Sequence, residues 1–176
     1  EGKKAHITFI NHATFLIQTP QVTFLTDPVF SQRASPVTFA GPKRVRGPGL
    51  TIDKLPAVDV VLISHNHYDH MDIESLKAID ARFHPLFITG LKNREFLIQK
   101  GLQNVVELDW WQEQKVKNAV ITFTPALHWS ARSLWDKFET LWGSFMVKVD
   151  GFKIYFAGDT GYSEHFRDIK VRSGAP

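Results

Sequence analysis

A short apolar run that ends in a cluster of metal-binding residue types constrains this chain more than any other feature. Residues 58–64 (VDVVLIS) are typical of a strand buried on both faces. Four metal-capable side chains follow within six positions: His65, His67, Asp69 and His70. On extended backbone His65 and His67 point the same way, while Asp69 and His70 lie where the chain turns into the next element. This density disfavours a polar loop with chance histidines and predicts a site for two neighbouring metal ions.

Strand and helix patterns alternate along the rest of the chain. Strands are predicted at residues 7–18, 22–26, 86–89, 105–108, 119–125, 145–149 and 153–157. Asp150-Gly151 is a two-residue hairpin turn between the last two. Helices are predicted from Asp72, as N-cap, to about Ala81, and over 92–100. The mixture predicts an α/β or α+β fold with a mixed sheet.

Length and composition limit the remaining possibilities. The 176 residues suit one domain over 1–176, and the absence of cysteine leaves His, Asp and Glu as the possible metal ligands. Since Lys and Arg are mostly scattered at a net charge of +3, we expect no nucleic-acid partner. No apolar run reaches the roughly 20 residues of a transmembrane segment. We expect a cytoplasmic location, although a chain that starts at Glu1 is compatible with a trimmed leader.

Residues 31–50 form a long loop rich in Pro, Gly and Arg. It carries basic side chains and no acid over residues 33–46: Arg33, Lys43, Arg44 and Arg46. Two interpretations stay open, a solvated loop or a rim that attracts anions to the site.

Two further ligand candidates follow predicted strands at points where the backbone becomes irregular. His128 lies in TPALHWS, and Asp159 lies in AGDTG. Alternatively, His128 is a core or capping histidine and Asp159 a turn carboxylate. The upstream cluster favours metal binding for both.

HNHYDH at residues 65–70 resembles the HxHxDH signature of the metallo-β-lactamase superfamily, and His128 and Asp159 match its next two ligand motifs in order. The chain also resembles one branch, the N-acylphosphatidylethanolamine-hydrolysing phospholipase D and its bacterial relatives. That finer resemblance rests on residues 11–17 (NHATFLI), 25–36 (LTDPVFSQRASP), 41–44 (GPKR), 128–132 (HWSAR), 141–144 (LWGS) and 157–162 (AGDTGY).

The resemblance implies an αββα sandwich with mixed β-sheets and a cofactor of two zinc ions, with manganese or iron as other possible metals. It implies three ligands for the first ion: His65, His67 and His128. It implies three for the second: Asp69, His70 and a bridging Asp159. Asp27 would support the metal loop from behind, and His12 would lie near the site without an assigned role.

The superfamily takes a last histidine for the second metal from a later strand, and this chain ends at Pro176, before that segment. His165 is the only histidine after Asp159, in a predicted helix that leads away from the site. We therefore expect a domain truncated in its C-terminal half, with a weaker second metal site. We also expect self-association into a homo-oligomer through the face left uncovered.

The implied activity is hydrolysis by a hydroxide that bridges two metals, with Asp69 and His70 as catalytic metal-holding residues. A phosphodiesterase acting on a phospholipid-like substrate is favoured, with peripheral membrane contact possible. Arg33, Arg44 and Trp129 are the candidate substrate contacts. A lactonase or other carboxyl-ester or amide hydrolase acting on a small molecule uses the same metal residues, and a metal-binding fragment without catalysis is the third alternative.

Overall fold

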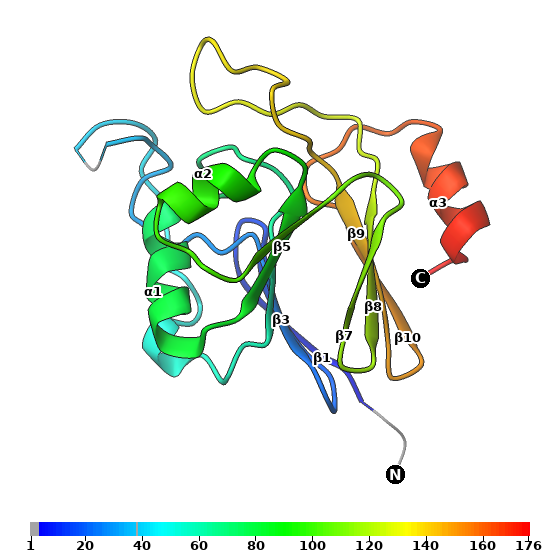
Figure 1. Ribbon diagram of the computed structural model, residues 1–176. Helices are drawn as coiled ribbons and strands as arrows, with labels where there is room; N and C mark the ends of the chain where they lie inside the picture. The colour runs from blue at the N-terminus through cyan, green and yellow to red at the C-terminus, as the bar shows by residue number, and fades with distance from the viewer. Residues whose placement is uncertain (1–3, 38) are drawn as a thin grey trace.

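The computed structural model describes residues 4–37 and 39–176. Residues 1–3 and 38, which belong to the predicted domain and the predicted loop, lie outside the described residues. Two β-sheets pack face to face, with α1 and α2 outside the first sheet and α3 outside the second (Figure 1). The predicted αββα sandwich is confirmed.

The first sheet has six strands in the order β1-β2-β3-β4-β5-β6. They are β1 His6–Asn11, β2 Thr14–Gln18, β3 Thr23–Thr26, β4 Val60–Leu62, β5 Leu86–Gly90 and β6 Val105–Leu108. β1 to β3 pair antiparallel and β3 to β6 pair parallel. Helices α1 (Ile73–Phe83) and α2 (Arg94–Gln99) connect the parallel strands, and a 3-10 turn lies at Ile52–Lys54.

The second sheet is antiparallel, in the order β10-β9-β8-β7. Its strands are β7 Glu113–Val116, β8 Ala119–Thr124, β9 Ser144–Val149 and β10 Phe152–Phe156, followed by α3 His165–Ser173. The predicted turn joins β9 to β10, with positive φ at Asp150 (53°) and Gly151 (87°). None of the described helices combines the length and apolar character needed to span a bilayer.

Alternating residues of the first sheet fill two separate cores. On one face, Leu25, Val61 and Phe87 pack against Leu76 of α1 and Leu97 of α2. On the opposite face, Phe24, Val60 and Ile88 pack against Ile121 and Phe145 of the second sheet. β4 is buried on both faces, as its apolar sequence predicted, because it lies in the middle of the sheet with a core on each side.

The structure differs in detail from the predicted elements at three points. Residues 7–18 form two strands, because the chain reverses at His12 and Ala13. β7 was missed, since its sequence EQKV is polar and only half-buried. Asp72 precedes α1 as predicted, but its side chain makes no capping bond; it accepts hydrogen bonds from Ser31 instead.

Candidate metal centre

The predicted ligands gather where several elements end. The segments after β3, β4 and β8 supply Asp27, the HNHYDH loop and His128, and the segment after β10 supplies Asp159. Gly158, at a φ of 58°, permits this approach, since a Cβ there would lie 2.6 Å from the Cβ of Ser64. The fold thus unites residues more than 130 positions apart, from Asp27 to Asp159.

Three histidines form the first group. The candidate ligand atoms of His65, His67 and His128 all lie within 4.8 Å of one another. His67 Nδ1 lies 2.8 Å from His65 Nε2 and 3.3 Å from His128 Nε2. Ligand atoms of a tetrahedral zinc with bonds of 2.0–2.1 Å are about 3.3 Å apart. The donor set therefore fits a zinc ion with few adjustments.

A second group surrounds His70. Its Nε2 lies 3.3 Å from Asp159 Oδ2 and 3.8 Å from Asp69 Oδ2. Asp159 Oδ2 also lies 3.8 Å from His128 Nε2, between the two groups. His12 Nε2 lies 3.1 Å from Asp69 Oδ2. The predicted residues are thus brought together, and their ligation of metal stays a prediction.

Asp27 lies behind both groups, and its support of metal binding stays a prediction. Its fully buried carboxylate accepts hydrogen bonds from Ser64 N (2.7 Å), Ser64 Oγ (2.6 Å) and His70 Nδ1 (2.7 Å). Ser64 Oγ in turn lies 2.9 Å from His65 Nδ1. These contacts occupy the rear nitrogen of each ring and leave Nε2 facing the site. Such outer contacts fix both the tautomer and the ring orientation of metal-binding histidines.

The two groups differ in protonation. Burial, followed by the neighbouring imidazoles, lowers the pKa of His65 to about 2, and burial also lowers the pKa values of His67 and His128. Burial opposes the charged form of His70 as well, but hydrogen bonds to Asp159 and Asp27 outweigh it and raise the pKa of His70 to about 10. At neutral pH the first group is therefore neutral, and the second holds a proton that a metal must displace.

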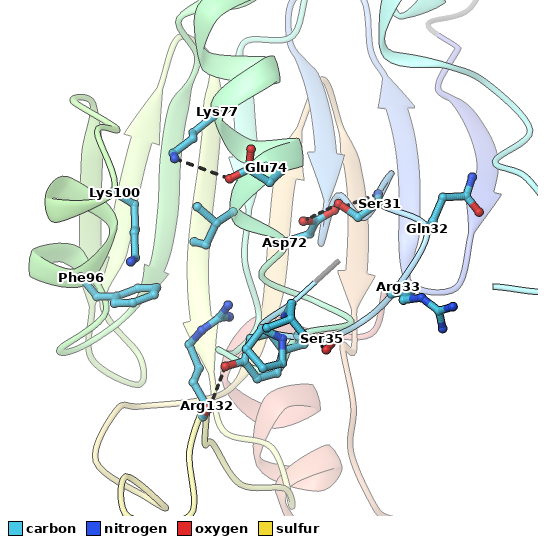
Figure 2. Close-up of a pocket in the computed structure, with 14 residues that line it drawn as sticks. Ser31, Gln32, Arg33, Ser35, Asp72, Glu74, Lys77, Phe96, Lys100 and Arg132 are labelled. Carbon is cyan, nitrogen blue, oxygen red and sulfur yellow. Dashed lines mark hydrogen bonds and ion pairs between the residues drawn. The ribbon is translucent and has the colours of Figure 1, made fainter. Parts of the chain in front are cut away.

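Arg132 braces the HNHYDH loop, a role that the sequence did not reveal. Its Nη1 donates to Asn66 O (2.8 Å), within the loop, and to Met71 O (2.9 Å), directly after it. Its guanidinium lies 4.2 Å from the centre of the Tyr68 ring, and Tyr68 donates a hydrogen bond back to Arg132 O. Figure 2 shows Arg132 at one end of a cavity of about 720 Å³ beside the loop. Only the HWSAR match marked this residue in the sequence.

The remaining candidates have different surroundings. Trp129 packs on His67, with 4.3 Å between ring centres. Arg44 donates to the backbone carbonyls of Ser31 and Val29, and Arg33 donates to Gly41 O, so both arginines also shape the 31–50 loop. Substrate contact by these three stays a prediction.

His165 lies at the start of α3, in contact with Thr160 and Ser163. Among the residues that the structure describes, it belongs to none of the groups able to hold a metal.

Comparisons with known proteins show the family to which this chain belongs. A family described as the Beta-lactamase superfamily domain matches residues 22–175. An N-acyl-phosphatidylethanolamine-hydrolyzing phospholipase D of Saccharomyces cerevisiae is 43% identical over 85% of this chain and 33% of its own length. A Caenorhabditis elegans protein with the same activity in its name is 36% identical over 95% of this chain and 50% of its own. The chain thus spans half or less of the length of these relatives.

The fold is also shared with solved structures. A metallo hydrolase of the archaeon Ignicoccus hospitalis matches with a TM-score of 0.69 and 24% identity, over 96% of this chain and 66% of that one. Because the superfamily match covers most of the chain, and the sandwich and its grouped histidines accompany it, this chain belongs to the metallo-β-lactamase-fold family of metal-dependent hydrolases.

Proposed function

We propose that this protein is a dinuclear zinc hydrolase that cleaves phosphodiesters of the N-acylphosphatidylethanolamine type. The observation that supports the phosphodiester most directly is an amphipathic cavity of about 700 Å³ that reaches His12 and Asp69. Its walls combine apolar side chains, such as Phe9 and Val29, with Lys43 and Arg44 from the basic loop. A lipid phosphate needs such a pairing of cations and apolar surface beside the reacting group.

Each part of the chain contributes a separate function to this activity. Two zinc ions would lower the pKa of a water molecule towards neutrality and stabilise charge on the phosphoryl oxygens. Asp27 and Ser64 hold the rings of His70 and His65 in position, and Arg132 keeps the loop between them in shape. Lys43 and Arg44 would attract the phosphate to this end of the sandwich.

Two names among the relatives support the substrate class. The yeast and nematode relatives are both named as hydrolysing N-acyl-phosphatidylethanolamine. A lactonase or other carboxyl hydrolase of this fold would need the same histidines, so the metal residues alone do not choose between the substrates.

Substrate choice can be tested by offering the purified, zinc-loaded protein N-acylphosphatidylethanolamine and, under matched conditions, a panel of lactones and carboxyl esters. We expect release of phosphatidic acid from N-acylphosphatidylethanolamine in mixed micelles, at rates well above hydrolysis of lactones and carboxyl esters. The double variant Lys43→Gln/Arg46→Gln, which leaves the structural bonds of Arg44 in place, should raise KM for the phospholipid and leave small neutral esters unaffected. Faster turnover of lactones would favour the carboxyl hydrolase, and bound zinc without turnover of either panel would favour a non-catalytic metal protein.

A further inference from the structure

The turn over residues 130–140, between β8 and β9, projects from the end of the sandwich that carries the metal groups (Figure 1). Leu134 and Trp135 lie in the middle of this turn, and each is 90% exposed. Apolar surface in contact with water gains free energy when a partner covers it. Two adjacent large apolar side chains held in water therefore indicate a surface that binds a partner.

Hydrogen bonds within the turn hold its backbone in this shape. The Asp136 carboxylate accepts from the backbone nitrogens of Arg132 (3.0 Å) and Ser133 (2.7 Å). Phe138 N donates to Ser130 O at 2.9 Å, which closes the base of the turn. The two apolar side chains are thus presented outward by a built turn, and the chain does not fold them onto its own surface.

Other exposed apolar side chains surround the metal groups at the same end. Leu127 directly precedes His128 in the chain, and Gly161 N donates to Leu127 O at 2.9 Å, which places exposed Tyr162 beside it. Exposed Val45 of the 31–50 loop lines the cavity that reaches Asp69. We call these side chains the apolar rim: Val45, Leu127, Leu134, Trp135 and Tyr162.

Basic side chains accompany the apolar rim. Lys137 Nζ lies 4.9 Å from the centre of the Trp129 ring, and Trp129 packs on His67. Residues 33–46, which include Lys43 and Arg46, carry no acid. Apolar side chains with tryptophan at the acyl boundary, and cations level with the phosphates, are the combination that an anionic phospholipid surface attracts.

The same charges disfavour a second copy of this chain as the partner. A symmetric contact through the apolar rim would bring the 130–140 turn of one copy against that of the other. Lys137 and the basic 33–46 segment would then face cations of the same sign, which opposes association. The charge pattern therefore favours a lipid surface over self-association at this face.

We propose that the apolar rim docks this end of the protein on a membrane surface that contains anionic phospholipids, with Leu134 and Trp135 entering the interface. The metal groups then face the bilayer. The proposal goes beyond the proposed function, because docking needs a lipid surface and no phosphodiester cleavage. The turn also contains Arg132, which braces the HNHYDH loop, so the docked element is directly connected to the metal centre.

Vesicle binding tests this proposal without any measurement of activity. Wild type, Leu134→Ser/Trp135→Ser, Lys43→Gln/Arg46→Gln and the control Val171→Ser are sedimented with vesicles of phosphatidylcholine, with and without phosphatidylglycerol. Val171 is 79% exposed on α3, away from the apolar rim. Quenching of tryptophan fluorescence by brominated lipids compares wild type with Trp135→Phe. Circular dichroism checks the fold of each variant, and light scattering measures self-association.

We expect wild type and Val171→Ser to bind the anionic vesicles equally. Leu134→Ser/Trp135→Ser should bind more than about tenfold more weakly, since each apolar side chain withdrawn from water adds to the affinity. Lys43→Gln/Arg46→Gln should lose about 10–30-fold on anionic vesicles. Brominated lipids should quench wild type more than Trp135→Phe.

Three results would each overturn the proposal. They are absence of vesicle binding in wild type, equal binding in Leu134→Ser/Trp135→Ser, and equal quenching in wild type and Trp135→Phe. Self-association that the Leu134→Ser/Trp135→Ser change abolishes, in a protein that does not bind vesicles, would assign the apolar rim to a second copy. Because the vesicles contain no N-acylphosphatidylethanolamine, vesicle binding without phosphodiester hydrolysis would support the docking and refute only the proposed function.

Discussion

Replacement of Asp27 by Asn tests how the fold prepares the second metal site. The change keeps shape and volume but removes the charge from a fully buried carboxylate. An Asn nitrogen facing His70 Nδ1 must donate to it, so the ring must place its own proton on Nε2. That proton would occupy the position from which His70 binds metal. We therefore expect the second ion to bind about 10–100-fold more weakly while the first is little affected.

Asp27→Asn should also change the stability of the metal-free protein. The rise in the pKa of His70 from 6.5 to about 10 corresponds to about 5 kcal/mol of preference for the protonated ring. Asp159 is 41% exposed, so solvent screens its part, and buried Asp27 carries the larger share. We expect Asp27→Asn to lower the free energy of unfolding by about 2–3 kcal/mol.

The pH dependence of this loss of stability follows from the direction in which the pKa of His70 is shifted. A raised histidine pKa contributes stability that is complete below pH 6.5 and is lost as pH rises through about 10. Urea unfolding with metal removed, at pH 6 and pH 10, measures the difference, and zinc calorimetry measures the affinity. Asp59→Asn is the control, since Asp59 is a half-buried carboxylate that accepts from Thr23 N at the other end of the strands. Equal stability and equal second-ion affinity in Asp27→Asn would refute the role assigned to Asp27.

Three further predictions concern the same centre. Asp69→Asn should retain the first zinc, lose the second and reduce turnover by orders of magnitude, because a neutral amide holds a cation poorly. Metal analysis and rate measurements on the same samples check this, and unchanged turnover at saturating zinc would contradict it. Calorimetry in buffers of different ionisation enthalpy should show about one proton released when the second ion binds and almost none when the first binds. Because the released proton comes from His70, the affinity for the second ion should rise with pH up to about 10. Equal proton release for both ions would contradict the assigned protonation. Arg132→Ala should lower the free energy of unfolding by about 3 kcal/mol, because two charge-assisted hydrogen bonds are lost, and should weaken the binding of both metal ions. The control Arg82→Ala, at an exposed arginine, should do neither. Urea unfolding and zinc titration compare the two variants.

The sequence predicted what depends on local pattern. The apolar run before His65 predicted a doubly buried strand, and the spacing of the HNHYDH loop predicted which side chains share a site. The reversal at His12 was missed because Asn-His-Ala-Thr has none of the glycine that usually marks a tight turn. A histidine in the left-handed region is uncommon enough that only tertiary anchoring reveals it.

Contacts between distant segments were beyond the reach of pattern alone. Arg132 braces a loop more than sixty positions earlier, and nothing near Arg132 in the sequence signals that partner. β7 is a polar strand that forms by pairing with β8, so its own sequence carries little strand signal. The role predicted for Asp27 came from the resemblance to the superfamily and not from the pattern of residues around it.

A crystal structure of the zinc-loaded protein, with anomalous data at the zinc edge, tests the two-metal centre most directly. The account predicts two ions about 3.5–4 Å apart. His65, His67 and His128 should surround one, with nitrogen–zinc distances of about 2.0–2.1 Å. Asp69 and His70 should bind the other, with Asp159 between the two. A single ion, or His128 turned away from His65 and His67 in the loaded protein, would contradict it.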